Sequence, residues 1–125
     1  MTTKVAVMTT QEVADRLYEL FEEGKWKEAQ EELFSKDAKS IEPANSSGLP
    51  SVEGLDNIKK KAEVWESMVE EMHGGYTGKP IVAGSHIALA MGIDATMKGS
   101  GRMKMDEIAV YEVKDGKIIS EQFFF

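Results

Sequence analysis

The chain has 125 residues, a length that fits one domain with one core, and we expect residues 1–125 to form that single domain. Twenty-two acidic residues against fifteen basic ones give a net charge of -7, which repels nucleic acid backbones and anionic membranes, so we predict neither partner. Cysteine is absent, which excludes disulfides, a thiol nucleophile and a thiolate metal site. The N-terminus has no apolar run of signal-peptide length, and this predicts a cytoplasmic location.

The first third of the chain predicts two helices. Thr9 and Glu12 have the spacing of a capping box, which marks the start of a helix. Apolar residues then recur at helical spacing as far as Gly24: Val13, Leu17, Leu20 and Phe21. The pattern resumes over residues 26–34, with charged residues on the opposite face, and this predicts a second, shorter helix.

Residues 36–42 read as a short strand that ends at Pro43, where proline withdraws a backbone donor, and a Ser/Gly/Pro loop over residues 45–50 follows. Glu42 therefore sits where a strand gives way to a loop. Reactive side chains are often carried at such positions on a rigid support, so Glu42 is the first chemical candidate.

The second half of the chain predicts one further helix and then a meander of strands. Gly54 and Asp56 offer a helix start, and the helix is expected to end at Gly74 and Gly75. One stripe of this helix carries its apolar residues: Ile58, Ala62, Trp65, Val69 and Met72. Extended segments are then predicted over residues 76–83, 86–98, 102–113 and 117–125, with an Asp-Gly hairpin turn before the last. Helices followed by long antiparallel strands indicate an α+β domain.

This order of elements, together with three stretches of sequence, resembles a known family. The stretches are SKDAKSIEP, EGLDNI and the tail MDEIAVYEVKDGKIISEQFFF. They resemble the SnoaL-like branch of the nuclear transport factor 2-like superfamily, which includes ketosteroid isomerase. The resemblance implies a cone, with three N-terminal helices packed on a curved, mostly antiparallel mixed sheet that encloses an apolar cavity. It does not imply one reaction, because this fold hosts several isomerases, cyclases and dehydratases as well as binding modules.

Comparison with ketosteroid isomerase assigns roles by position. That enzyme uses a carboxylate base, and a tyrosine and a protonated aspartic acid as oxyanion donors. Glu42 matches the base, whereas the two donor positions fall on Leu17 and Ala109, neither of which can donate. We therefore do not expect ketosteroid isomerisation by that mechanism.

Strand alternation under the same alignment assigns the faces of the sheet. Residues 107, 109, 111 and 113 are expected to face the cavity, as are 119, 121, 123 and 125 of the last strand. Glu42, Glu107 and Glu121 would then share one cavity, where burial and mutual repulsion raise the pKa of at least one carboxyl and so allow acid and base roles. The residues predicted to contact a ligand are Leu17, Phe21, Trp65, Met68, His73, Met91, Tyr111 and Phe123, and Phe125 adds to the wall.

We predict that a small hydrophobic molecule occupies this cavity, and that any catalysis there is cofactor-free and metal-free proton transfer of the isomerase or hydratase/dehydratase type. Glu42 would be the base, Glu121 or Glu107 the acid, and His73 or Tyr111 would orient the substrate. Small residues on the outer face of one strand, Ala88, Ala90 and Gly92, predict a homodimer through that face.

Each candidate also has a structural alternative. Glu42 can cap backbone amides of the following loop. Glu107 and Glu121 can form ion pairs on a solvated face with three basic residues, Arg102, Lys104 and Lys117. His73 can be a helix C-terminal residue. The corresponding alternative functions are a non-catalytic ligand-binding or protein-interaction dimer, and a scaffold dimer with a filled core.

Overall fold

The structure, a computed structural model, describes residues 7–44 and 48–125. Residues 45–47 of the predicted loop lie outside this range. Helices α1 (Thr10–Glu22) and α2 (Trp26–Leu33) come first, followed by strands β1 (Phe34–Ile41) and β2 (Val52–Glu53) and helix α3 (Leu55–Met68). The remaining elements are strands: β3 (Val69–Thr77), β4 (Ile81–Ala83), β5 (His86–Met97), β6 (Gly101–Lys114) and β7 (Lys117–Phe124).

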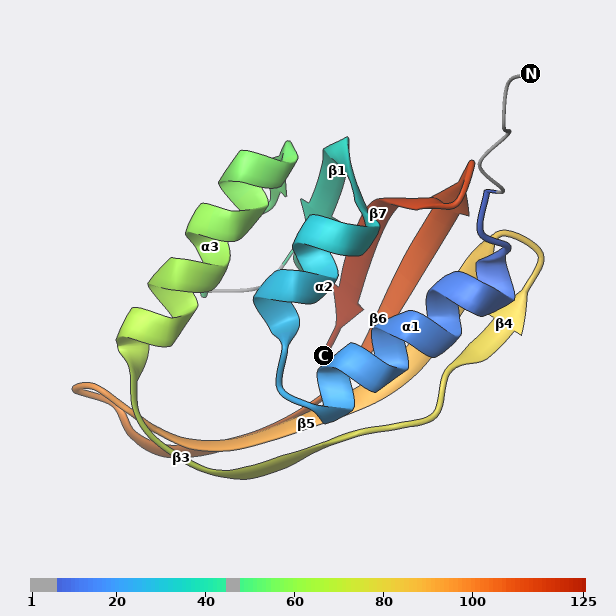
Figure 1. The fold of residues 1–125 in the computed structure, drawn as a ribbon. Helices are drawn as coiled ribbons and strands as arrows, with labels where there is room; N and C mark the ends of the chain where they lie inside the picture. Colours follow the sequence, from blue (N-terminus) through green and yellow to red (C-terminus); the bar gives the residue numbers. More distant parts are fainter. Residues whose placement is uncertain (1–6, 45–47) are drawn as a thin grey trace, which may run out of the picture.

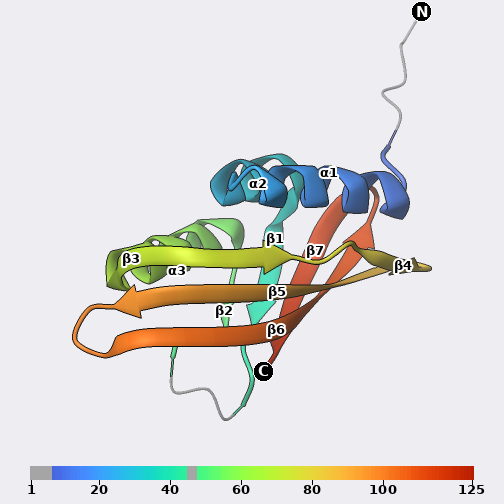
Figure 2. The ribbon, with the colours of Figure 1, turned by 90° about the horizontal axis from the view of Figure 1, so that it is seen from below.

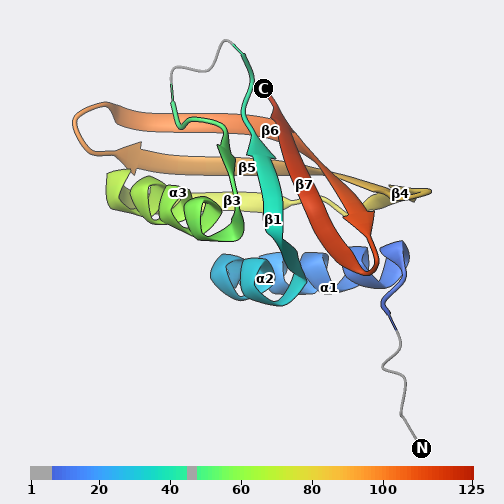
Figure 3. The same cartoon turned by 90° about the horizontal axis from the view of Figure 1, so that it is seen from above.

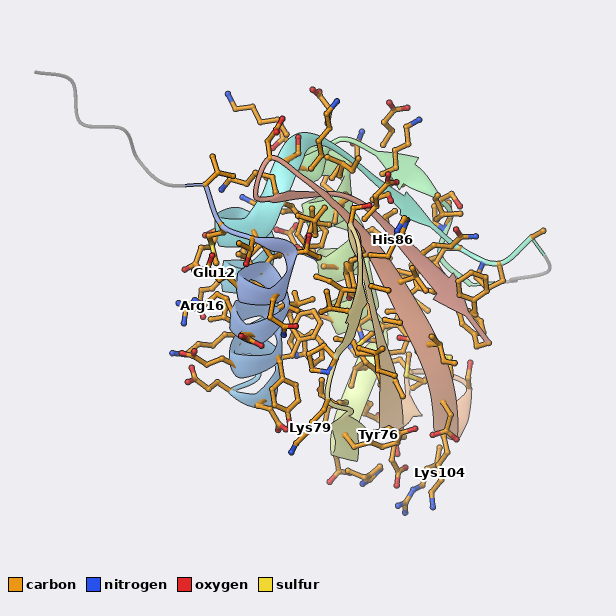
Figure 4. The ribbon with its side chains drawn as sticks, turned by 90° about the vertical axis from the view of Figure 1, so that its right-hand side faces the viewer. Glu12, Arg16, Tyr76, Lys79, His86 and Lys104 are labelled. Atoms are coloured by element: carbon orange, nitrogen blue, oxygen red, sulfur yellow. The ribbon has the colours of Figure 1, made fainter. Side chains whose placement is uncertain are left out.

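Helix α1 begins as the sequence predicts. The Thr9 hydroxyl accepts a hydrogen bond from the Glu12 amide at 3.1 Å, and the Glu12 carboxylate accepts one from the Thr9 amide at 3.0 Å. This capping box satisfies two backbone donors that have no partner within the helix. Glu12 and Arg16 project from the side of α1 that faces away from the sheet (Figure 4), so the opposite, apolar side of the helix packs on the core.

The strands form one mixed sheet in the order β2-β1-β7-β6-β5-β3, with β4 paired to the start of β5. All neighbouring pairs are antiparallel except β1 and β7, which run parallel. The three helices of the described residues cover one face of this sheet, and the long β5–β6 hairpin curves beneath them (Figure 1). Strands β1 and β7 cross β3 and β5 at a steep angle (Figures 2 and 3), which gives the sheet the strong curvature of an α+β cone.

The end of the third helix was predicted wrongly. Helix α3 ends at Met68, and residues 69–77 pair with β5 as strand β3. Gly74 and Gly75 lie inside this strand, where a β-carbon on Gly75 would come within 2.5 Å of the Gly92 carbonyl oxygen. Gly75 therefore permits close approach of two strands, and the long-range pairing with β5 overrides a helical apolar pattern at Val69 and Met72.

The last hairpin follows the sequence, apart from one β-bulge. Asp115 and Gly116 both have positive φ, 51° and 75°, as a two-residue turn between β6 and β7 requires. A register shift beside Glu112 and Val113 then inserts one extra residue into β7. Ile118 is fully buried as a result, and Ile119, which we expected to face inward, is displaced from that position. Over residues 121–124 the predicted parity holds.

The core lies between the helices and the concave face of the sheet. Its largest fully buried side chains include Leu17 and Leu20 of α1, Ile58 of α3, Ile87 of β5 and Tyr111 of β6. Among the described residues, no helix has the length and apolar character needed to cross a membrane.

Candidate active site

The site is built first from β1 and β7, which run side by side. Ala38 and Ser40 are buried on alternate positions of β1, and Glu42 continues this inward face just past the end of the strand. In the parallel pairing Ser40 lies opposite Glu121. The Ser40 hydroxyl donates a hydrogen bond of 2.7 Å to Glu121 Oε1, within the core.

Helix α3 adds a cation to this pair. Lys61 lies one turn after the buried Ile58 and one turn before Trp65, on the helix face that packs against β1. Its ammonium donates to Ser40 Oγ at 2.6 Å and to Glu42 Oε1 at 3.0 Å, and it lies 5.8 Å from the centre of the Phe123 ring. The ammonium thus has two hydrogen-bond acceptors and one aromatic face around it.

The result is a continuous chain of hydrogen bonds, Glu42–Lys61–Ser40–Glu121, which we call the relay. It is shielded from solvent: Ser40 is 0% exposed, Glu121 6% and Lys61 8%. The Glu42 side chain is 12% exposed. Charged groups are rarely this buried without partners, and here each partner is a member of the relay.

Two carboxyls of the site have raised pKa values. Burial raises the pKa of Glu121 to about 7, and the Glu42 carboxylate adds to the rise, while the Ser40 hydrogen bond and the Lys61 ammonium oppose it. Burial also raises the pKa of Glu107 to about 7, with further contributions from the negative charges of Glu42 and Glu121. Near neutral pH both carboxyls can therefore act as proton donors as well as acceptors.

Tyr111 lies across the strands from Glu121, at paired positions of β6 and β7. Its ring packs near Phe21 and Phe34, with centroids 6.5 and 6.3 Å away. Burial, together with the charges of Glu121 and Glu107, raises the pKa of the phenol well above its usual value. Tyr111 therefore stays protonated and remains a hydrogen-bond donor.

The predicted apolar residues lie around this site to different depths. Leu17, Phe21 and Met91 are buried in the same core cluster as Tyr111, and Phe123 packs against it. Trp65 is half-buried and Met68 is 40% exposed, so the end of α3 is covered less than the sequence suggested. Phe125 is 52% exposed and does not wall an enclosed space. Instead, an open pocket of about 460 Å³ lies beside Glu42, lined by residues 41–44 and 122–125.

Comparison with known proteins agrees with the fold and the sequence pattern. The family model for the SnoaL-like domain matches residues 8–125, nearly the whole chain. The chain belongs to the SnoaL-like family.

The solved structures similar to this SnoaL-like protein include one from Mesorhizobium loti, described as a candidate SnoaL-like polyketide cyclase. It is 34% identical, with a TM-score of 0.88, and the match covers 94% of this chain and 100% of that one. An NTF2-like protein of unknown function from Burkholderia pseudomallei (17% identity, TM-score 0.75, 94% and 92% covered) and a candidate isomerase from Bacillus subtilis (18%, 0.71, 93% and 88%) share the fold. No curated protein matches the chain.

In this SnoaL-like protein His73 does not lie with the carboxyls. It is an exposed residue of β3, not a helix terminus, and its Nε2 lies 2.6 Å from the Thr96 hydroxyl. Thr96 alternates with the buried Ala95 and Met97, so both residues belong to the outer face of the sheet. The error follows from the misplaced end of α3, which moved His73 to the wrong element and the wrong face.

The ion-pair alternative for Glu107 and Glu121 is not observed in the described part of the chain. Arg102 pairs with Asp94, and Lys117 donates to the Glu32 carbonyl, so neither pairs with Glu107 or Glu121. The Glu42 carboxylate pairs with Lys61, while the Glu42 amide donates to the Ser51 hydroxyl at 2.8 Å. Across the described residues, no group of three potential ligands is arranged to hold a metal ion.

Sequence reasoning missed Lys61 and Ser40. The signal was present for both: Lys61 shares a helical face with Ile58 and Trp65, and Ser40 shares strand parity with Glu42. A lysine on an apolar helical stripe indicates a buried partner of opposite charge, but the pattern does not say which one.

Proposed function

We propose that the protein binds a small hydrophobic molecule beside the relay and catalyses cofactor-free proton transfer on it, of the isomerase or hydratase/dehydratase type. The observation that carries this proposal is the placement of a third carboxyl, Glu107, near an ion-paired Glu42 and a hydrogen-bonded Glu121. Two of these three carboxyls have pKa values of about 7, where a residue can give or take a proton at neutral pH.

The proposed step uses Glu42 as the base and Glu121 or Glu107 as the acid. Glu42 removes a proton from a carbon next to a carbonyl, and the electron pair of that C–H bond forms a carbon–carbon double bond. The carbonyl oxygen takes the proton of Glu121 or Glu107, which gives a neutral enol. Glu42 returns the proton to a conjugated carbon in an isomerisation; in an exchange it first trades that proton for one from solvent and returns the new one to the same carbon. In both cases the enol proton goes back to the carboxylate. In a dehydration, the acid protonates a leaving hydroxyl group instead.

The hydrophobic character of the substrate is inferred from the side chains around the carboxyls. Phe123 covers Lys61, Tyr111 lies opposite Glu121, and Met91 is the cross-strand neighbour of Glu107. Such a lining offers aromatic and thioether contacts with few competing polar groups, and so favours a compact apolar or aromatic compound that carries one oxygen function.

The test uses 2-tetralone, a compact aromatic ketone with acidic α-protons, as the probe in D₂O. Exchange of its α-protons is followed by proton NMR with wild type, Glu42→Gln and Glu107→Gln. The matched control is Glu66→Gln, an exposed carboxyl on α3. We expect wild type and the control to accelerate exchange equally and Glu42→Gln to lose the acceleration. Equal rates with wild type and Glu42→Gln would contradict the proposal.

A specific observation supports a second candidate, the non-catalytic binding module. The two positions that carry oxyanion donors in ketosteroid isomerase are occupied by Leu17 and Ala109, both 0% exposed, so the core is closed there with apolar groups. Binding of 2-tetralone, seen as shifts of Tyr111 and Phe123 signals, without any exchange would favour this candidate.

We further propose that the protein forms a homodimer through the outer face of the sheet. Ala90, Ile108 and Phe124 are exposed neighbours on β5, β6 and β7, and Ile108 and Phe124 are 50% and 49% exposed. A second copy of the chain would cover this row of apolar residues. Gly92, which we expected in the open face, is instead buried beneath the ring of Tyr76, so the proposed contact is centred on Ala90 and Ile108.

A further inference from the structure

The Lys61 ammonium leaves the hydroxyl of Ser40 only one possible direction for its hydrogen bond. An ammonium group has three donors and no acceptor. Because Lys61 Nζ lies 2.6 Å from Ser40 Oγ, the serine oxygen must accept from it. The single proton of the hydroxyl is then free to point elsewhere, and Glu121 Oε1 lies 2.7 Å away in the other direction.

The same reasoning fixes the role of each oxygen of Glu121. Oε1 receives the Ser40 proton and can act only as an acceptor, so a protonated Glu121 carries its proton on Oε2. Among residues 7–44 and 48–125, no hydrogen bond to Oε2 is formed. Glu121 lies between the fully buried Ser40 and the cross-strand Tyr111, and is itself 6% exposed. Its carboxyl therefore has little freedom to exchange the two oxygens.

We propose that Lys61 and Ser40 are positioning residues, which hold the proton of Glu121 on Oε2 and stabilise the carboxylate when that proton leaves. The proposal rests on the proposed function of Glu121 as an acid, and it adds two residues to that site. Neither Lys61 nor Ser40 touches the substrate in this assignment. They act through Glu121, and Lys61 also acts through its ion pair with Glu42.

An uncoupled alternative is that Lys61 serves Glu42 alone and that Ser40 only fills a polar gap. The two accounts differ in what happens at Glu121 when the hydroxyl is removed. In the relay, Ser40→Ala removes a hydrogen bond to the ionised form of a buried carboxylate, and such bonds stabilise the charged form. The pKa of Glu121 should then rise by about one unit or more, since a hydrogen bond to a charged group contributes about 1.5–3 kcal/mol.

The experiment is a carboxyl-detected NMR titration of Glu121 in the intact chain without any ligand, so its outcome does not depend on turnover. The variants are Ser40→Ala, Ser40→Thr, which keeps the hydroxyl, and Lys61→Gln, which keeps a donor and removes the charge. Ser120→Ala is the matched control, because Ser120 precedes Glu121 on β7 and points to the other side of the strand.

We expect a higher Glu121 pKa in Ser40→Ala and in Lys61→Gln, recovery towards wild type in Ser40→Thr, and no change in Ser120→Ala. An unchanged or lower Glu121 pKa in Ser40→Ala, with the chain folded, would overturn the assignment. If Ser40→Ala does not fold, Ser40→Cys takes its place, because its thiol is similar in size and donates only a weak hydrogen bond.

A second readout links the relay to chemistry. The rate of 2-tetralone exchange should fall as pH rises through the pKa of the acid. In Ser40→Ala this fall should occur at higher pH, by the same amount as the shift of the Glu121 pKa measured by NMR. A shift in the titration without any exchange activity would uphold the relay and reject the proposed function. A shift in neither would reject the relay.

Discussion

Carboxyl groups on the two faces of the sheet have pKa values that are shifted in opposite directions. On the inner face, Glu107 and Glu121 have pKa values raised to about 7, mainly through burial. On the outer face, the Arg102 guanidinium makes a bidentate contact with Asp94 at 2.9 and 2.8 Å and holds the pKa of that carboxyl below its usual value. The pKa values of these carboxyls therefore differ because Glu107 and Glu121 are buried away from water, whereas Asp94 is exposed and paired with a cationic side chain.

On the outer face, a tyrosine side chain also links neighbouring strands. Tyr76 crosses above Gly92 and donates to Asp106 at 2.7 Å, so three adjacent strands are joined on the solvent side. Tyr76 and Lys104 lie near one end of the long strands, far from His86 at the other (Figure 4). The Tyr76–Asp106 contact is an exposed hydrogen bond, and such a bond contributes little to stability because water can replace either partner. The inner face thus carries the proposed catalytic carboxyls, and the outer face carries the proposed dimer contact.

The largest expected effect is on activity. Glu42→Gln removes the proposed base, and we expect the exchange of 2-tetralone protons to slow by about 100-fold or more, the range that general base catalysis supplies. The variant should remain folded, because glutamine can still accept a hydrogen bond from Lys61. Thermal melting confirms folding, and an active Glu42→Gln variant would break the assignment of chemistry to this face.

A smaller effect is expected on stability at Glu121. Its folded pKa of about 7 lies above the ordinary glutamate value of 4.5, so the folded state binds this proton more tightly than the unfolded state does. Stability from this group is therefore complete at pH below 4.5 and is lost as pH rises through 7. Replacement by neutral glutamine should remove this loss and raise the free energy of unfolding at pH 8 by on the order of 2 kcal/mol.

Urea unfolding at pH 5 and pH 8 measures this effect for wild type, Glu121→Gln and the exposed control Glu66→Gln. The gain at Glu121 should be present at pH 8 and much smaller at pH 5. A Glu121→Gln variant that is destabilised at both values would indicate a structural ion pair instead of a strained acid.

On the outer face, the proposed dimer gives the next test. Ile108→Lys places a charge at the centre of the apolar row, where burial against a second copy would be costly. Size exclusion coupled to light scattering should show a dimer for wild type and a monomer for the variant at micromolar concentration. Lys104→Gln, outside that row on the same strand, serves as the control, and a monomeric wild type would refute the dimer.

The smallest effect is expected at the outer ion pair. Asp94→Asn removes the partner of an exposed Arg102, and we expect it to change the melting temperature less than Glu121→Gln does. The effect of Asp94→Asn should be smaller still in high salt, because salt screens an exposed ion pair. Thermal melts at low and high ionic strength measure it. If Asp94→Asn changed the melting temperature more than Glu121→Gln does, the expectation that the outer ion pair contributes less to stability would be wrong.

The sequence predicted the parts of the fold that depend on local chemistry. The Thr9 capping box and the Asp115–Gly116 turn are specified by neighbouring residues and appear as expected. The parity of β6, which places Glu107 and Tyr111 inward, also follows from alternation alone. The end of α3 did not follow, because the pairing of β3 with β5 is a long-range interaction that local periodicity does not record.

The candidate site was predicted in part for the same reason. Glu42 was identified from its place before Pro43, and Glu121 from strand parity, which the β-bulge beside Val113 left intact beyond Ile119. The connection between them was not predictable, since it runs through Lys61 of α3 and Ser40 of β1. Which buried lysine meets which buried serine depends on how a helix packs on a sheet, and that is settled by tertiary structure.

The central claim is that the inner face holds carboxyls that can donate protons at neutral pH. A carboxyl-detected NMR titration of the wild-type protein tests it most directly, with Asp94 on the outer face as an internal reference. We expect Glu107 and Glu121 to titrate near 7 and Asp94 to titrate below the ordinary aspartate value of 3.8. Midpoints near the ordinary glutamate value of 4.5 for both residues would contradict the claim.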